Sequence, residues 1–448
     1  MKNEQDMTRG SIVRQLLMFA LPLMFGNVFQ LLYNTVDSIV VGNFMGTQAL
    51  AAVGSTSMIT NLAVFFFNGF ATGSGVIISN AFGAGDKERL HTAVETAITS
   101  TFIFCVIFTF AGMRSVNFML RLMDTPDDVF DQAAVYLNIY FAGISGLLLY
   151  NMGSAILRAV GDSRRPLILL IITSILNIFL DLLFVIQFHL GIAGVAYATI
   201  IAQAVSAFVV LMMLTAEKTD FRFVWKDVQI NGRAFGDIMK IGLPNGIQSV
   251  ITSFSNVFVQ GYINYFGSTV MAGWSCYNKV DSFIFLPVQS MGMAATTFVG
   301  QNAGAGKVDR VSKGTKDSII ISLIVTLITS TLIWILAPQA IELFSDDPTV
   351  IECGAMFVRT NCYFLLFNDI NHVLAGCLRG RGDSIGPMVI MLIGFVAVRQ
   401  TYLFFITRFV MNTARVVGFG YPVGWMATCV IEVLYFLRRW NRQETAAA

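Results

Sequence analysis

Long apolar runs follow one another along the whole chain and are separated by short polar stretches. Leu167–Phe188, Ser318–Ala337 and Pro387–Phe409 are each close to the roughly 20 residues that a helix needs to cross a bilayer core. Only helices and closed barrels satisfy their backbone groups in lipid, and the alternating segments of about ten residues typical of barrel strands are not found. The pattern therefore predicts an all-α polytopic membrane protein.

We expect twelve transmembrane helices. They cover approximately residues 14–41, 50–76, 92–113, 131–157, 166–188, 192–215, 236–264, 270–297, 316–337, 352–378, 387–409 and 416–437. Hydrophobic residues make up 55% of the chain and charged residues only 12%, whereas soluble domains have about 45–50% and 25%. The six cysteines form no CxxC pair and the three histidines are scattered, so we expect no metal centre, no cofactor and no enzyme.

The basic residues are distributed unevenly between the two sides of the predicted bundle. If the N-terminus is cytoplasmic, 22 of the 29 lysines and arginines fall in the cytoplasmic segments. Only Arg114, Arg121, Arg408 and Arg415 fall in the outer ones. The positive-inside rule then places both termini in the cytoplasm of a bacterial-type inner membrane.

An internal repeat divides the chain into two halves. The stretch 158–166 (RAVGDSRRP) returns at 379–387 (RGRGDSIGP), and 83–89 (GAGDKER) returns at 304–310 (GAGKVDR), both 221 positions later. The pair Leu21-Pro22 returns as Leu243-Pro244 after 222 positions. Each half holds six spans, which indicates a parallel repeat as in transporters with two pseudo-symmetric halves. We expect an N-terminal lobe over 1–215, a cytoplasmic linker over 216–235, a C-terminal lobe over 236–440 and a tail over 441–448.

The same motifs resemble a known family, the MATE (multidrug and toxic compound extrusion) transporters. The resemblance begins with 35–42 (TVDSIVVG) and 49–54 (ALAAVG), and includes the two Leu-Pro pairs, the Gly-Ala-Gly loops and the Gly-Asp-Ser loops. It covers essentially the whole chain in colinear order. It implies two six-helix lobes and the export of organic, often cationic, compounds driven by proton or sodium influx.

Two carboxylates inside the first lobe are candidates for a function, because insertion of a charge at the centre of a span costs about 2.5–3.5 kcal/mol. Asp37 shares one face of the first span with residues three, four and seven positions before it, and Asp181 shares one face of the fifth span with Asn177. The 221-residue offset maps Asp37 to Phe258 and Asp181 to Tyr402, so the second half folds without either carboxylate. The alternatives are a hydrated helix end for Asp37 and a simple contact with Asn177 for Asp181.

The resemblance implies a cation- or proton-coupling site in the first lobe. Its residues are Gln30, Tyr33, Asp37, Asn177, Asp181 and Thr199, and a sodium ion would use Asp37, Asn177 and Asp181. We expect contacts with substrate from Asn34, Asn151, Gln248, Asn256, Asp281 and Asp369. Pro22 interrupts the helical hydrogen bonds of the first span, so it is a candidate hinge, with a static kink as the alternative.

In the second lobe, Asp369 and Arg399 lie in the tenth and eleventh spans. They are explained either by a buried ion pair or by binding of a cation or basic drug at Asp369. Lys279 and Asp281 either pair locally or line the cleft.

The sequence thus predicts a monomeric antiporter, coupled to protons rather than sodium, that exports small organic compounds. Its partners are the lipid bilayer and its substrates, with no nucleic acid. The alternatives are a flippase for lipid-linked precursors of the same superfamily, and a membrane receptor or structural protein.

Overall fold

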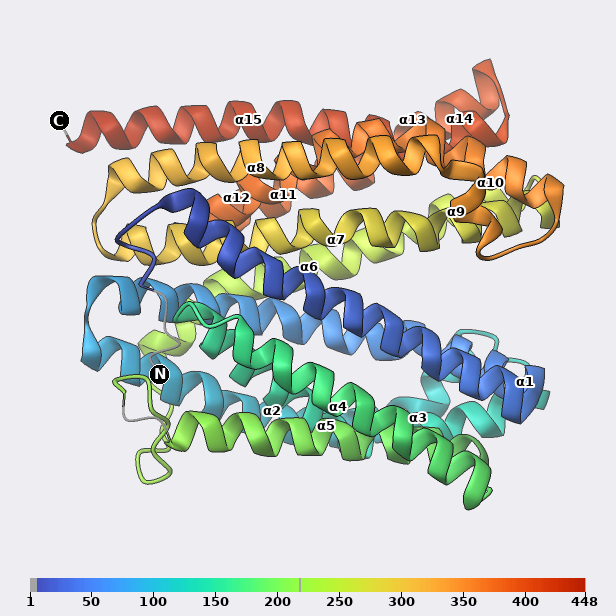
Figure 1. Cartoon of the computed structure of the whole chain (residues 1–448), viewed down its shortest axis with the longest axis horizontal. Helices are drawn as coiled ribbons and strands as arrows, with labels where there is room; N and C mark the ends of the chain where they lie inside the picture. The colour runs from blue at the N-terminus through green and yellow to red at the C-terminus, as the bar shows by residue number, and fades with distance from the viewer. Residues whose placement is uncertain (1–5, 217–218, 448) are drawn as a thin grey trace. The chain divides into compact units, whose positions relative to one another are not determined.

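The computed structural model describes residues 6–216 and 219–447, and this part of the chain consists of helices joined by short loops and a non-helical linker over residues 219–231 (Figure 1). Eleven of its helical segments are long and apolar enough to cross a membrane. They are Ile12–Gly46, Ala51–Ala84, Lys87–Leu122, Asp127–Ala159, Arg164–Gln187, Gly191–Ala216, Ser268–Gly304, Val308–Ile335, Pro348–Gly380, Ile385–Val410 and Ala414–Arg439.

The seventh predicted span corresponds to α6 (Gly232–Asn264), which is 33 residues long and contains Pro244. Its amide and hydroxyl side chains lower its mean hydropathy, so it is not among the eleven. With α6 counted, the described residues hold the twelve long helical segments that the apolar pattern predicted.

The remaining elements divide these segments further. The first two spans form α1 (Ile12–Ala84), and the others are α2 (Lys87–Leu122), α3 (Asp127–Ala159), α4 (Arg164–Leu182), η1 (Leu183–Gln187), α5 (Gly191–Ala216), α7 (Ser268–Gly304), α8 (Val308–Ile335), α9 (Ala337–Glu342), α10 (Pro348–Asn361), η2 (Cys362–Phe364), α11 (Leu365–Gly380), α12 (Ile385–Leu392), η3 (Ile393–Val398), α13 (Arg399–Phe405), η4 (Ile406–Val410), α14 (Ala414–Gly418) and α15 (Gly420–Ala447). Most helices extend several residues beyond the predicted spans, because hydropathy marks only the part of a helix that suits hydrocarbon.

The backbone repeats along with the sequence. Gly46 has φ 85° and ψ −178°, and it separates the two spans of α1. Gly267, which lies 221 positions later and precedes α7, has φ 87° and ψ 178°. Side chains with a Cβ rarely adopt this positive φ, so each half needs glycine at this turn.

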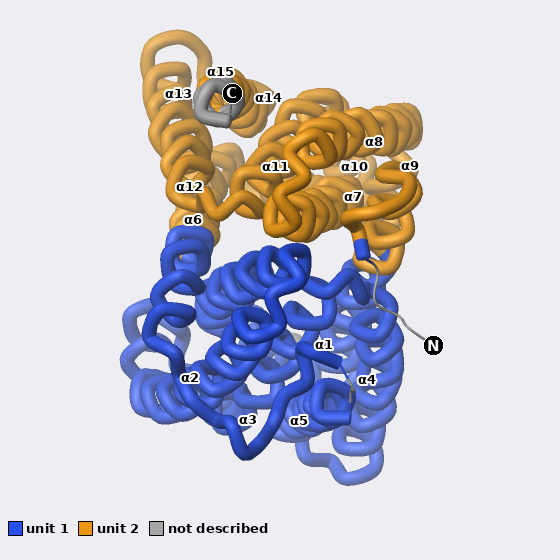
Figure 2. The backbone as a smooth tube through the Cα atoms, turned by 90° about the vertical axis from the view of Figure 1, so that its left-hand side faces the viewer, with its two compact units in different colours: residues 1–6, 25–246 blue, residues 7–24, 247–448 orange. Residues whose placement is uncertain are grey.

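Contacts between Cα atoms group the chain into two compact units, coloured in Figure 2. Unit 1 comprises residues 1–6 and 25–246, and unit 2 comprises residues 7–24 and 247–448. The two crossing points, after Met24 and after Gly246, each lie two residues beyond a proline, Pro22 or Pro244. The first part of α1 therefore packs within unit 2, and the first part of α6 packs within unit 1.

Glycines allow α6 to approach α1 closely inside unit 1. A Cβ on Gly69 would lie 2.4 Å from the backbone nitrogen of Gly246, and a Cβ on Gly73 would lie 2.5 Å from the carbonyl of Ile238. The two helices therefore cross with their backbones in contact, as small residues spaced by four permit in membrane helices.

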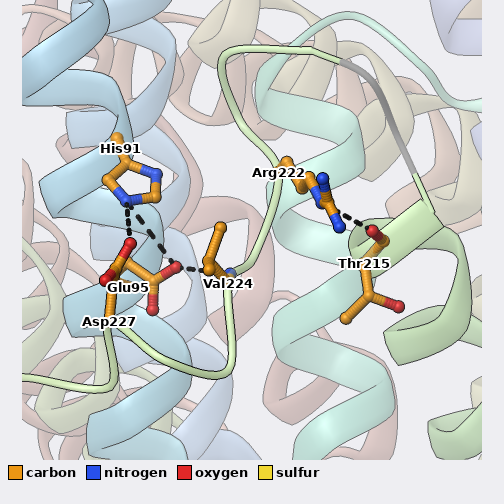
Figure 3. Close-up of polar contacts among 6 residues, drawn as sticks. All are labelled: His91, Glu95, Thr215, Arg222, Val224 and Asp227. Carbon is orange, nitrogen blue, oxygen red and sulfur yellow. Dashed lines mark hydrogen bonds and ion pairs between the residues drawn. The ribbon is translucent and has the colours of Figure 1, made fainter.

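The linker between the halves folds back onto the start of α2 in unit 1 (Figure 3). Glu95 is only 1% exposed, and its Oε1 accepts a hydrogen bond of 2.7 Å from the backbone N–H of Val224. His91 Nε2 lies 3.6 Å from Asp227 and 3.9 Å from Glu95. Arg222 donates to the carbonyl of Thr215 at 2.8 Å. The linker is thus attached to unit 1 by polar contacts.

Candidate functional site

Two buried residues of α4 form the centre of the candidate site in unit 1. Asn177 and Asp181 are 1% and 0% exposed. In the amide orientation that pairs both of its groups, Asn177 donates to Asp181 Oδ2 at 3.0 Å and accepts from the backbone N–H of Thr199 at 3.2 Å. Asn177 therefore connects α4 to α5 and holds the Asp181 carboxyl in place.

The first span supplies the second carboxyl group. Asp37 is half-buried and interacts directly with the side chains of Asp181 and Tyr33. Tyr33, one helical turn earlier, faces Thr199. The structure thus brings together five of the six residues predicted for the coupling site. Gln30, the sixth, is on the exposed part of this helix.

The contacts of these residues differ from the simpler alternatives. Asp37 lies within α1, nine residues before the turn at Gly46, so it is not at a helix end. Asp181 contacts Asp37 as well as Asn177.

Two tyrosines of α3 complete the surroundings and were missed in the sequence. Tyr136 lies close to both Asp37 and Asp181, and its ring stacks on that of Tyr140 at 6.3 Å. The spacing of four in α3 was the available signal, but aromatic residues are common in spans and few face a site. Close packing of α3 against α5 helps to position Thr199, because a Cβ on Gly146 would lie 2.8 Å from the backbone nitrogen of Ala204.

The arrangement favours the capture of one positive charge. Two ionised carboxylates offer only acceptors and repel each other, so a proton or a cation is needed between Asp37 and Asp181. Among the residues that the structure describes, no group of three or more His, Cys, Asp or Glu could hold a metal ion.

The six candidates for substrate binding differ in exposure. Asn34 and Asn256 are exposed, and Asn151 is half-buried. Three have side-chain partners within unit 2: Gln248 contacts the sulfur of Met391, Asp281 accepts from Tyr277 at 3.3 Å, and Asp369 accepts from Ser322.

Asp369 and Arg399 do not form the ion pair considered from the sequence. Asp369 is 0% exposed and bonds to Ser322 of α8. Arg399 donates to the hydroxyl of Ser255 at 2.6 Å, and its guanidinium lies over the Tyr421 ring at 4.8 Å. Lys279 likewise contacts Phe344 at 5.1 Å, whereas its neighbour Asp281 bonds to Tyr277. Each of these charged side chains contacts a hydroxyl group or an aromatic ring, and none of these contacts is with an opposite charge.

Pro22 lies inside α1, and the only non-helical backbone of that element is at Gly46. The proline is therefore accommodated within a continuous helix, two residues before the chain passes from unit 2 to unit 1.

Comparison with known proteins supports the repeat and identifies the family. A family model described as MatE matches residues 22–183 and again residues 244–400. The chain is 28% identical to the "Probable multidrug resistance protein YpnP" of Bacillus subtilis over 442 residues, which cover 97% of each chain. It is also 28% identical to the "Probable multidrug resistance protein YoeA" of the same organism over 448 residues, or 98% of this chain and 96% of that protein.

The fold agrees with this assignment. A solved structure described as an outward-facing conformation of a multidrug resistance MATE family transporter matches with a TM-score of 0.93, 22% identity and 99% coverage of both chains. The two matched segments, the twelve helical segments and the paired halves lead to one conclusion: this chain belongs to the MATE family of multi-pass membrane transporters, which are not enzymes.

Proposed function

We propose that the protein exports small, often cationic, organic compounds in exchange for protons, and that Asp37 and Asp181 bind the coupling proton. The observation that carries this proposal is the direct contact of these two carboxyl groups inside unit 1. The relatives named as multidrug resistance proteins support the class of substrate.

The surroundings of the carboxyl pair favour a proton over sodium. Sodium would need oxygen ligands, but Asn177 directs its amide nitrogen to Asp181 and its oxygen to the backbone N–H of Thr199. The remaining oxygens near the pair belong to the hydroxyls of Tyr33, Tyr136 and Thr199 and to the carboxyls themselves. A proton needs no such set of ligands, since one hydrogen between two carboxyls removes their repulsion.

Varied flat cations suit a chain with 39 phenylalanines and 21 methionines. Aromatic faces attract organic cations, and methionine adapts to ligands of different shape. We assign the contacts with substrate to Asn34, Asn151, Gln248, Asn256, Asp281 and Asp369.

Transport then proceeds by alternating access. A proton bound at the pair neutralises one charge, which weakens the drug-loaded outward state and releases the drug outside. We place the hinge at Pro22, because the contacts of α1 change from unit 2 to unit 1 just after it. One charge that crosses 100 mV supplies about 2.3 kcal/mol, which drives export of a neutral drug, whereas exchange of one proton for one monovalent cation moves no net charge and is driven by the pH gradient.

Ethidium–proton exchange in liposomes with an imposed pH gradient tests this function. We expect Asp37→Asn and Asp181→Asn each to lower exchange by about 100-fold, as expected when a positioned proton-transfer group is removed. Separate variation of pH and sodium distinguishes the two ions: exchange should follow pH at constant sodium. Full exchange by both variants, or dependence on sodium at constant pH, would refute the proposed coupling.

We also propose that both termini lie in the cytoplasm and that the protein works as a monomer. The excess of lysine and arginine in one set of loops supports this orientation. A cysteine introduced at Arg222 should react with an impermeant maleimide only after the cells are opened.

A further inference from the structure

A row of hydroxyl groups runs along one face of α8 in unit 2. Ser318, Ser322, Thr326 and Ser330 recur at every fourth residue, and each is at most 1% exposed. This spacing places them on one helix face, about 6 Å apart along the axis. Burial of four hydroxyl groups in a membrane helix costs free energy unless they have hydrogen-bond partners.

Three carboxyl groups lie along this row or at its ends. Near its middle, Asp369 of α11 accepts from Ser322, and Thr326 lies beside it. Toward the C-terminal end of α8, Asp281 accepts from Tyr277, which faces Asn361.

Toward the N-terminal end of α8, Cys377 of α11 contacts Thr315 and lies near Glu432 of α15. We call this row, together with Asp281, Asp369 and Glu432, the column, and all its members lie within unit 2.

Some atoms of the column have no hydrogen-bond partner in the protein. They are the Ser318 hydroxyl and both carboxyl oxygens of Glu432, whereas Thr326 interacts with Asp369 and Asn361 interacts with Tyr277. Buried polar atoms of folded proteins nearly always have a partner, and water is the usual one where side chains provide none.

Glu432 is the most unusual member. Its side chain is 0% exposed, and neither carboxyl oxygen has a hydrogen-bond partner. The titratable groups that face it are Arg379 and Cys377 of α11 and Cys429 of α15, and Arg379 acts on it electrostatically without a hydrogen bond to either carboxyl oxygen. The other elements that pack against α15 are α12 and η3, which carry no titratable side chain, η2 with Cys362 and Tyr363, α13 with Arg399 and Tyr402, and α14 with Arg415. A buried carboxylate without hydrogen bonds costs several kcal/mol, so this group is suited to bind and release a proton.

The first half keeps only part of this column. At the 221-residue offset, Ser322 corresponds to Thr101 and Ser330 to Thr109, whereas Ser318 corresponds to Ala97, Thr326 to Cys105 and Asp369 to Leu148. Glu432 corresponds to the apolar stretch 209–211. The repeat therefore folds without the carboxyls of Asp369 and Glu432 and without the hydroxyls of Ser318 and Thr326, and the coupling site assigned to unit 1 does not use them.

We propose that Glu432 is a proton-binding residue at one end of a hydroxyl-lined proton route through unit 2, and that this route carries a second proton in each transport cycle. The inference rests on the proposed exchange of drug for protons. A proton leaves the Asp369 carboxyl for a neighbouring hydroxyl or water, and each member in turn accepts one proton and donates another. The Glu432 carboxylate gains an O–H bond and later loses that proton to water.

The proton-to-drug ratio of the full-length protein in liposomes tests this route. Ethidium is the probe, and the ratio follows from the membrane potential at which net ethidium flux is zero. We expect the wild type to exchange two protons per ethidium and Glu432→Gln to exchange one, because the amide stays neutral throughout the cycle. At 100 mV, the steady ethidium gradient should then fall by about 50-fold, while exchange itself continues.

Ser318→Ala provides a second variant that removes only an unpartnered hydroxyl, and it should also lower the ratio from two to one. Its matched control is Ser206→Ala in unit 1, where the hydroxyl already donates to the carbonyl of Ala202 at 2.9 Å. This control should keep the ratio of two. Infrared difference spectra provide an independent readout, since the carbonyl band of a protonated carboxylic acid should disappear in Glu432→Gln.

An unchanged ratio in both Glu432→Gln and Ser318→Ala would overturn the proposal, as would a sodium-dependent ratio at constant pH. If Glu432→Gln does not fold, the ratio of Ser318→Ala alone decides. Failure of the proposed function appears differently, because the wild type would then show no ethidium–proton exchange, or Asp181→Asn would retain full exchange, whatever ratio the variants of unit 2 show.

Discussion

The two units share one backbone plan but bury their polar groups in different places. Unit 1 brings Asp37 and Asp181 together between α1 and α4, where unit 2 has Phe258 and Tyr402 at the same offset. Unit 2 buries Asp369 beside α8, where unit 1 has Leu148. Because either half folds without the carboxyls of the other, neither set is a requirement of the fold.

The surroundings of the two sets differ as well. Asp181 has an amide partner, Asn177, whose orientation is fixed by the backbone of α5. Asp369 instead meets the hydroxyl of Ser322, which can both donate and accept. A fixed amide favours the holding of a proton at one place, whereas a row of hydroxyls favours its movement.

Exchanging residues between the two halves should have the largest effect. Leu148→Asp introduces the carboxyl of unit 2 into unit 1, where Thr101, the counterpart of Ser322, already donates to the carbonyl of Ala97 at 2.8 Å, and we expect a loss of about 3–5 kcal/mol of stability. The reverse change, Asp369→Leu, leaves the hydroxyls of Ser322 and Thr326 without this partner and should cost about 1–3 kcal/mol. Thermal unfolding of the purified proteins measures both. Equal losses of stability in the two variants would contradict this difference between the units.

Asn177→Val should have the next largest effect, because it gives unit 1 the residue that unit 2 has at Val398. The change removes the donor to Asp181 and the acceptor from Thr199, so we expect a loss of about 1–3 kcal/mol in thermal unfolding. Ethidium–proton exchange should fall with it. Val398→Ala is the matched control in unit 2, and it should leave exchange intact. If Asn177→Val exchanged as fast as the wild type, the Asn177 amide would have no role in the coupling site.

The apolar pattern was sufficient to predict the helices, since a span must be hydrophobic wherever it meets lipid. Helical spacing, together with the family resemblance, also predicted that Asn177, Asp181 and Thr199 converge. The resemblance placed Gln30 at the site as well, yet it is exposed, because a helix face is wider than the area covered by its neighbour.

Other features needed the tertiary structure. Residues 7–24 pack within unit 2 although they belong to the first half of the sequence, because the apolar faces of a span do not specify which helix covers them. The hydroxyl partner of Asp369 was missed for a related reason. Serine and threonine often bond to their own helix backbone, so their spacing in α8 did not identify them as partners of a carboxyl.

Tyr136→Phe tests a smaller difference at the site itself, since unit 2 has Phe357 at this position. Tyr136 lies near both Asp37 and Asp181, and loss of its hydroxyl should cost about 0.5–1.5 kcal/mol. The rate of ethidium–proton exchange should therefore fall between about twofold and tenfold. Tyr140→Phe removes a hydroxyl from the stacked neighbour and should have less effect. A larger loss from Tyr140→Phe would place the important hydroxyl one turn further along α3.

The smallest effect is expected where the linker meets unit 1. Glu95 accepts from Val224, whereas its counterpart in unit 2, Lys316, is exposed. Glu95→Gln keeps an acceptor but loses the charge that strengthens this bond, so we expect about 1 kcal/mol less stable docking of the linker. Protease cleavage within residues 219–231 should rise by about fivefold, because it follows the population of the undocked linker. Lys316→Gln should leave cleavage unchanged. Equal cleavage in Glu95→Gln and the wild type would mean that Thr96, which accepts from Asn231 at 3.2 Å, holds the linker without help from Glu95.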